Sequence, residues 1–214
     1  MLLVELDSIS RRVIRELCMD SRVPVRVMAE RIGCSRSTVA SRIRLVEKTV
    51  GLHYTIEPDM ASLGLNFSYF IAVKLRSDIP EKKLVSFLSQ SPILQFGALC
   101  KGDFDLLLFA SARNQLEFMR WASSFRSAFS GEISSWKASH LVLARYGFFP
   151  LNDATITRST VPSPQRELLI ELNRNSRQSF RELAKRMKTT VQRVRYNFRL
   201  LQKLGYAKRF TAVI

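Results

Sequence analysis

The sequence predicts an α+β chain with a winged helix-turn-helix at each end and a ferredoxin-like βαββαβ sandwich between them. The first observation is a repeat, because residues 163–214 follow the pattern of 6–56 after a shift of 155 positions. The second is the stretch between the copies, where short runs of period two alternate with longer runs of helical spacing. We therefore expect domains at 1–60, 61–149 and 163–214, with a linker at 150–162.

Residues 1–60 predict three helices and a strand. Asp7 or Ser8 is suited to cap the first helix, and Pro24 to open the second. Gly33 provides the left-handed end of the second helix, and Ser35 then caps the third. Residues 51–56 are expected to form the strand of the wing.

The third helix of this copy carries hydroxyls and guanidiniums on its outer face. Such groups near a helix N-terminus bind phosphates, and an arginine can form two hydrogen bonds with guanine. The candidate DNA-binding residues are Arg36, Ser37, Thr38, Ser41, Arg42 and Arg44. The alternative is a solvated helix face, and Arg42, beside the core stripe, could instead bridge two helices.

The middle segment predicts strands at 67–75, 93–100, 104–110 and 132–144, with helices at 80–89 and 114–129. In the second helix we expect Leu116, Met119, Ala122, Phe125 and Phe129 on the buried face. A βαββαβ order places both helices on one face of the sheet. Residues 104–110 are apolar on both faces, so the uncovered face is predicted to be buried in a homodimer or a larger homo-oligomer.

The last segment repeats the helix-turn-helix pattern after a stretch rich in Thr, Ser, Pro and Asn, which predicts a flexible linker. Ser163 or Pro164 opens the first helix, Ser179 caps the second, and Thr189 or Thr190 starts the third. The outer face of the third helix holds groups suited to adenine, guanine and phosphate. Its candidate residues are Gln192, Arg193, Arg195, Tyr196, Asn197, Arg199 and Lys203. The alternative is a domain that contacts only proteins.

The net charge of +16 lies mostly at the C-terminal end. Residues 161–214 contain 13 Lys and Arg against 3 acids, whereas residues 1–60 contain 10 against 8. Clustered on a helix-turn-helix pattern, this excess favours double-stranded DNA as the partner. No stretch approaches the roughly 18 apolar residues of a membrane span, so no membrane partner is expected and the predicted location is cytoplasmic, at the nucleoid.

Several of these stretches carry a family resemblance. The runs Arg12–Leu17 and Met28–Ser35, with Gly102-Asp103-Phe104-Asp105-Leu106 in the middle segment, resemble the Lrp/AsnC family of prokaryotic transcription regulators. The resemblance spans residues 6 to about 149. It implies a DNA-binding regulator whose middle domain dimerises and binds a small effector such as an amino acid. By position, Gly102, Asp103 and Asp105 would line or shape the effector site.

Three alternatives remain beside that resemblance. Gly102-Asp103 could be only a hairpin turn, which these residue types favour. The chain could also be an architectural DNA-binding protein without an effector. The third alternative is an enzyme like the sirohaem decarboxylases, which similarly join a helix-turn-helix to this sandwich. His53 and His140 are the only histidines, and no catalytic or metal-binding spacing occurs, so we expect a regulator that has no cofactor and is not an enzyme.

Overall fold

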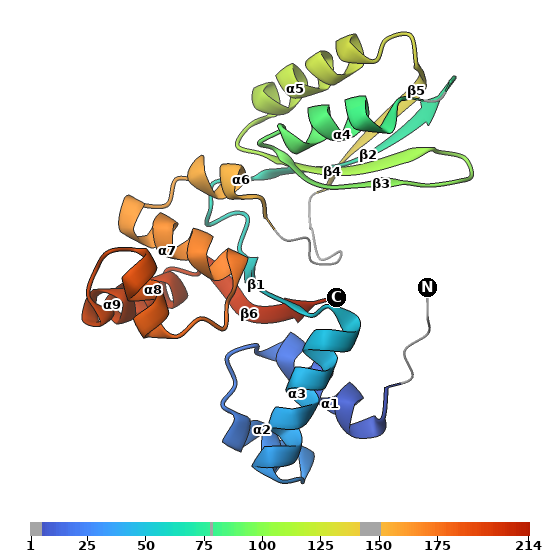
Figure 1. Cartoon of the computed structure of the whole chain (residues 1–214). Coiled ribbons are helices and arrows are strands. Elements are labelled where there is room, and N and C mark those ends of the chain that lie inside the picture. Colours follow the sequence, from blue (N-terminus) through green and yellow to red (C-terminus); the bar gives the residue numbers. More distant parts are fainter. Residues whose placement is uncertain (1–5, 78, 142–150) are drawn as a thin grey trace. The chain divides into compact units, whose positions relative to one another are not determined.

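The computed structural model describes residues 6–77, 79–141 and 151–214. They form two compact units, and the chain leaves the first unit and later returns to it (Figure 1). One unit joins the N-terminal residues up to Asp59 to residues from Val161 onward, and the other comprises Met60–Thr160. The two helix-turn-helix segments therefore share one unit, whereas the sequence predicted separate domains.

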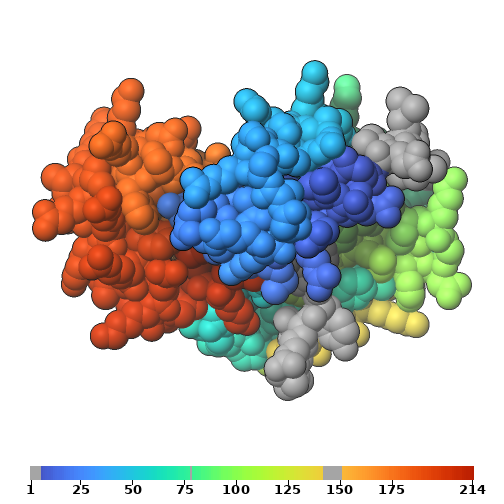
Figure 2. Space-filling model, turned by 90° about the horizontal axis from the view of Figure 1, so that it is seen from below, coloured from blue at the N-terminus to red at the C-terminus, as the bar shows by residue number. Residues whose placement is uncertain are grey.

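The first unit contains two halves of the same construction. The first half comprises α1 (Ser8–Met19), α2 (Val25–Ile32), α3 (Arg36–Val50) and β1 (His53–Pro58). The second half comprises α7 (Ser163–Arg174), α8 (Phe180–Arg186), α9 (Val191–Lys203) and β6 (Ala207–Val213). Seen from below, the helices of the first half (blue) and of the second half (orange to red) lie beside each other (Figure 2).

The predicted helix boundaries in this unit are confirmed by their caps. The Asp7 side chain accepts a hydrogen bond from the backbone N–H of Ser10, and Ser35 does the same for Thr38. Gly33 ends α2 in the left-handed region with φ 74°. In the second half, Ser179 forms a capping box with Glu182, which satisfies two backbone donors at once.

The strand predicted at 51–56 is present as β1, whereas a last domain joined to the chain only by a flexible linker is not what the structure shows. Each half supplies a single strand, and β1 pairs antiparallel with β6. Thr55 lies opposite Thr211, and Ile56 lies opposite Phe210. A lone strand would leave the backbone donors and acceptors of both its edges without partners, and this pairing satisfies those on the edge where β1 and β6 meet.

The second unit has the predicted βαββαβ order and begins with β2 (Phe67–Leu75), α4 (Glu81–Ser89) and β3 (Leu94–Leu99). It continues with β4 (Leu106–Ala112), α5 (Gln115–Ala128) and β5 (Ile133–Leu141). The antiparallel sheet has the order β3-β4-β2-β5, and α4 and α5 cover one of its faces (Figure 1). Residues 142–144 of the fourth predicted strand lie outside the described residues.

The buried face of α5 differs from the prediction. Phe125 and Phe129 are buried as predicted, but Phe118 and Trp121 are buried with them, whereas Leu116 and Met119 are more than half exposed. Apolar residues occur on most sides of this helix, and the aromatic side chains bury more area than Leu or Met. The helix is therefore rotated to place its largest rings on the sheet.

The predicted linker at 150–162 is largely part of the middle unit. It contains a short helix, α6 (Asp153–Thr157), whose N-cap residue Asn152 donates its amide to the carbonyl of Leu94 at 2.8 Å. The Thr155 hydroxyl donates to the carbonyl of Pro92, and Ile156 is fully buried. The polar side chains that suggested flexibility form hydrogen bonds to the start of β3.

Among the described residues, no helix combines the length and the apolar character needed to cross a bilayer.

Candidate nucleic-acid interface

The third helix of each half is held by its apolar face and its N-cap. Val39 and Val46 of α3, and Val194 and Leu201 of α9, are fully buried. The opposite face of each helix is left to solvent. In a helix-turn-helix this is the face that enters the major groove of DNA.

On α3, the structure places four of the six predicted residues on the exposed face. These are Arg36, Ser37, Ser41 and Arg44, while Thr38 is half-buried. Some of the hydroxyls already have intramolecular partners. Ser41 Oγ donates to the carbonyl of Thr38 at 2.8 Å, and Ser37 Oγ lies 2.8 Å from Ser35 Oγ. The two arginines have no carboxylate partner among the described residues, so they are available to phosphates or bases.

Arg42 bridges two helices rather than facing outward. Its Nη2 lies 2.9 Å from Oδ2 of Asp7, the residue that caps α1. The backbone N–H of Ser10 and, to a lesser extent, the Arg42 charge hold the pKa of Asp7 below its ordinary value of 3.8. The predicted DNA contact of Arg42 is therefore replaced by the alternative that the sequence left open.

On α9, six of the seven predicted residues are exposed, and Tyr196 is the most apolar of them at 62% exposure. No carboxylate of the described residues pairs with Arg193, Arg199 or Lys203. Arg195 lies over the Phe180 ring, with its guanidinium carbon 5.8 Å from the ring centroid. This face presents free cations, one amide and one phenol, a set that can bind both phosphates and base edges.

The prediction for Asn197 is wrong. Its side chain is 5% exposed and accepts a hydrogen bond from Nε2 of Gln165 at 2.9 Å. Its own amide donates to the carbonyl of Arg193 at 3.0 Å. Asn197 lies three residues after Val194 and four before Leu201, so the helical period places it on the core face. A polar side chain at that period should have been assigned to a buried hydrogen bond.

Sequence reasoning missed one cation beside α9. Lys188 occupies the turn between α8 and α9 with φ 49°, a left-handed conformation that costs a non-glycine residue about 1 kcal/mol. A shift of 155 residues places Gly33, at φ 74°, on the same position. The repeat alignment contained this signal, because the second half has a lysine where the first has the turn glycine.

The cations of β6 are engaged in ion pairs. Lys208 Nζ lies 3.6 Å from an Asp59 carboxylate oxygen, and the Arg209 guanidinium pairs with Glu57. Both acids belong to the end of β1 or follow it directly. These two cations therefore help to hold β1 and β6 together. Because their charges are paired, they add less to the positive surface of the helix-turn-helix unit than two free cations would.

In the middle unit, the predicted effector residues form the connection between β3 and β4. Asp105 accepts hydrogen bonds from the backbone N–H of Leu75 at 2.8 Å and from Lys74 Nζ at 3.0 Å. These two donors, the backbone first, hold the pKa of Asp105 below 3.8. Gly102 adopts φ 134°, and its carbonyl accepts a hydrogen bond from Lys74, while the Asp103 side chain is exposed. Asp105 thus holds the turn in place, whereas the Asp103 carboxylate has no ion-pair partner among the residues that the structure describes.

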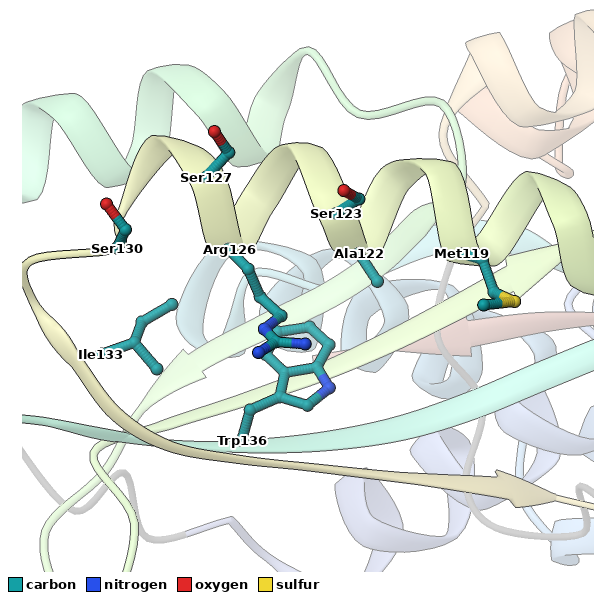
Figure 3. Close-up of a pocket in the computed structure, with 8 residues that line it drawn as sticks. All are labelled: Met119, Ala122, Ser123, Arg126, Ser127, Ser130, Ile133 and Trp136. Atoms are coloured by element: carbon teal, nitrogen blue, oxygen red, sulfur yellow. The ribbon is translucent and has the colours of Figure 1, made fainter.

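A separate pocket of about 570 Å³ lies between α5 and β5 (Figure 3). Arg126 of α5 and Trp136 of β5 point toward each other across it. It is lined by Met119, Ala122, Ser123, Arg126, Ser127, Ser130, Ile133 and Trp136. None of the three predicted effector residues lines this pocket.

Within the described ranges, no group of three or more His, Cys, Asp or Glu side chains is arranged to hold a metal ion.

Comparison with known proteins supports the two helix-turn-helix assignments separately. An AsnC-type helix-turn-helix domain matches residues 6–45, and a winged helix-turn-helix DNA-binding domain matches residues 164–208. An uncharacterized HTH-type transcriptional regulator of Pyrococcus abyssi is 30% identical over 118 residues, which cover 54% of this chain and 79% of that protein. The proline dehydrogenase transcriptional activator of Rhodobacter capsulatus is 30% identical over 121 residues, covering 54% of this chain and 77% of that protein.

Solved structures share the fold. A transcriptional regulator of Neisseria meningitidis, crystallised as a complex with L-Met, superposes with a TM-score of 0.61 at 18% identity. The match covers 69% of this chain and 97% of that one. B. subtilis LrpC superposes with a TM-score of 0.56 at 23% identity, covering 67% of this chain and 99% of that one. Nearly all of each neighbour is matched, so about a third of the present chain is additional to both.

Proposed function

We propose, from the premise that the chain belongs to the Lrp/AsnC family of transcription regulators, that it regulates transcription by binding specific double-stranded DNA through α3 and α9. The observation that carries this proposal is the pair of exposed cationic faces. Arg44 on α3 and Arg199 on α9 occupy equivalent positions after a shift of 155 residues, and neither has a carboxylate partner among the described residues. Unpaired guanidiniums on recognition helices bind phosphates and guanine edges.

The salt dependence of DNA binding tests this proposal. For Arg199→Ala we expect weaker binding at every salt concentration, and a slope of log affinity against log salt smaller by about 0.9 for one lost phosphate contact. Fluorescence anisotropy of a labelled duplex gives both quantities. Lys82→Ala is the control, because it removes an exposed cation from α4 of the other unit. If Arg199→Ala behaves like Lys82→Ala, α9 does not contact DNA.

Assembly with a second copy through the open face of the sheet is part of the proposal. Three phenylalanines form one row across it, because Phe109 of β4 lies opposite Phe96 of β3 and Phe70 of β2. Phe70 and Phe96 are 37% and 36% exposed. The face packed on α4 and α5 carries the alternate residues of β2, such as Ile71, so this row lies on the other side. An apolar sheet face of this kind is typical of a protein interface.

Light scattering coupled to gel filtration tests that assembly. We expect Phe70→Asp to lower the mass from that of an oligomer toward that of one chain, because a charge would then be buried without a partner. Val85→Asp on α4 is the control, since Val85 is 54% exposed on the helical side. An unchanged mass for Phe70→Asp would place the interface elsewhere.

The proposal further includes an amino-acid effector bound by the middle unit near Gly102 and Asp103, with Asp105 fixing the turn. Its support is the family membership and the free carboxylate of Asp103 on a turn that Lys74 and Asp105 fasten. A thermal shift screen with the standard amino acids tests this part. A ligand that raises the melting temperature of the parent chain should lose its effect in Asp103→Asn. A ligand that stabilises both proteins equally would direct attention to the pocket between α5 and β5.

A further inference from the structure

The two halves of the helix-turn-helix unit are built on the same internal contacts. Arg31 pairs with Glu16 at 2.9 Å between α2 and α1, and Arg186 pairs with Glu171 at 3.1 Å between α8 and α7. A shift of 155 residues carries one ion pair onto the other. The duplication therefore extends from the helices to the side-chain pairs that fix how the helices pack.

Contacts between the halves also occur in reciprocal pairs. The backbone N–H of Ser21 donates to the carbonyl of Phe210 at 2.9 Å, and that of Ser176 donates to the carbonyl of Tyr54 at 3.1 Å. Ser21 and Ser176 are equivalent in the repeat, and their hydroxyl oxygens lie 2.6 Å apart. A residue that meets its own equivalent lies on a symmetry axis.

The two-stranded sheet has the same property, with an offset of 156 residues in place of 155, which makes Thr55 equivalent to Thr211 and Tyr54 equivalent to Phe210. Thr55 lies opposite Thr211, and each threonine hydroxyl crosses to the helix of the other half. Thr55 Oγ1 donates to Oδ1 of Asn173 in α7, and Thr211 Oγ1 donates to the carbonyl of Cys18 in α1. Cys18 and Asn173 are again equivalent after a shift of 155 residues. Reciprocal contacts of this kind define an isologous, two-fold interface, here formed within one chain.

We infer that one chain reads two half-sites of DNA as a single unit, with α3 in one half-site and α9 in the other. This rests on the proposed DNA binding. Helix-turn-helix dimers present two recognition helices to half-sites about one helical turn apart through two-fold symmetry. The exposed residues of α3 and α9 take no part in the contacts between the halves, so both faces are free in the assembled unit.

The two recognition helices are not alike, so the half-sites must differ. After the shift, Ser37 corresponds to Gln192, and Thr38 corresponds to Arg193. Gln and Arg can each form two hydrogen bonds with adenine and guanine, respectively, whereas short hydroxyls form single bonds with little preference. The target of one chain is therefore an asymmetric site bound in one orientation, in which the half under α9 is the more strictly specified.

Lys188 also indicates that the second half contributes more to DNA binding than the first half. It adopts the strained left-handed turn just before α9, where the first half has Gly33. Strained residues of this kind persist mainly at functional positions. A cation at this turn, near the N-terminus of α9, adds to the attraction for phosphate. The second half thus supplies more of the non-specific hold on DNA as well as more of the sequence preference.

Selection from a randomised DNA pool by the purified chain tests the inference. A randomised region of about 20 base pairs holds two half-sites one turn apart. The parent chain should enrich two unlike half-sites at a fixed spacing. The double variant Gln192→Ala/Arg193→Ala should lose preference in one half-site only and bind the parent site about tenfold more weakly. Lys82→Ala is the control for loss of one charge.

A gain-of-symmetry variant makes the test independent of any loss of folding. Ser37→Gln/Thr38→Arg/Ala40→Arg/Ser41→Tyr gives α3 the exposed residues that α9 carries at the equivalent positions, and it should shift the enriched motif toward a palindrome. Loss of preference in both half-sites of the Gln192→Ala/Arg193→Ala motif would overturn the inference, because equivalent helices of two chains would then read them. A parent motif with one half-site would overturn it as well. Both results leave specific DNA binding by the chain intact, whereas no enrichment by the parent chain removes the proposed function and the inference together.

Discussion

Arg22→Ala should loosen the helix-turn-helix unit more than any other single change at the contact between its halves. The Arg22 guanidinium donates to the backbone carbonyls of Ser176 and Gln178, the second at 2.9 Å. Its carbon lies 5.1 Å from the ring centroids of both Phe180 and Phe198. All four partners belong to the second half of the unit, while Arg22 belongs to the first.

The expected loss follows from these contacts. A hydrogen bond to a charged donor contributes about 1.5–3 kcal/mol, and a cation–π contact contributes about 0.5–2 kcal/mol. Because contacts of one side chain are not additive, we expect a loss of about 3 kcal/mol of unfolding free energy. Arg177 is the equivalent residue, but its contacts are with the Tyr54 ring at 5.0 Å and the Tyr54 hydroxyl at 3.4 Å. Arg177→Ala should therefore cost only about 1 kcal/mol.

Urea denaturation can follow the two units separately. The chain has two tryptophans, Trp121 and Trp136, and both belong to the middle unit. Tryptophan fluorescence therefore reports that unit, while far-UV circular dichroism reports both. For Arg22→Ala we expect the dichroism transition of the helix-turn-helix unit to move to lower urea by roughly 1–3 M, with the fluorescence midpoint unchanged. Equal losses for Arg22→Ala and Arg177→Ala would refute the reasoning, as would an unchanged dichroism transition.

Two further predictions use the same measurements. Asn197→Ala should lower the unfolding free energy of the helix-turn-helix unit by about 1–3 kcal/mol, because Gln165 loses its buried partner. The same variant should leave the preferred DNA sequence unchanged. An altered preference would show that Asn197 belongs to the DNA interface. The pKa of Asp105 is lowered in the folded chain, first by the Leu75 N–H, so its stabilising contribution is present above pH 3.8 and is lost as the pH falls through the folded-state pKa. In Asp105→Asn the fluorescence midpoint of the middle unit should therefore fall less steeply below about pH 4 than in the parent, and parallel curves would show that the carboxylate does not support the turn.

Local signals in the sequence were enough to predict the helices and the middle sandwich. Ser35, Gly33 and Ser179 are capping and turn residues whose effects depend on a few neighbours. The alternation over 67–75 likewise gave the bounds of β2 as the structure has them. The pairing of β1 with β6 was not predicted, since it joins residues about 155 positions apart and no local pattern encodes a partner at that distance.

In the candidate site, too, the residues that depend only on local pattern were predicted correctly, and those that depend on distant partners were not. Exposed cations such as Arg44 and Arg199 follow from helical period alone, and the structure places them on the outer faces as expected. Arg42 and Asn197 were misassigned because their partners, Asp7 and Gln165, lie on other helices. The polar composition of 150–162 suggested a linker, because composition does not reveal that Asn152 and other side chains there bond to the start of β3.

The pairing of the two halves within one chain can be tested directly by a disulfide across their axis. In a chain with Cys18, Cys34 and Cys100 replaced by Ser, the variant Ser21→Cys/Ser176→Cys carries its two thiols where the hydroxyl oxygens lie 2.6 Å apart. After mild oxidation, the account predicts a disulfide within the chain, seen as the mass of one chain with no free thiol. Two free thiols would show that the halves do not meet, and covalent dimers would show that the strands pair between chains. Either result would contradict the account of one chain as a two-fold DNA-binding unit.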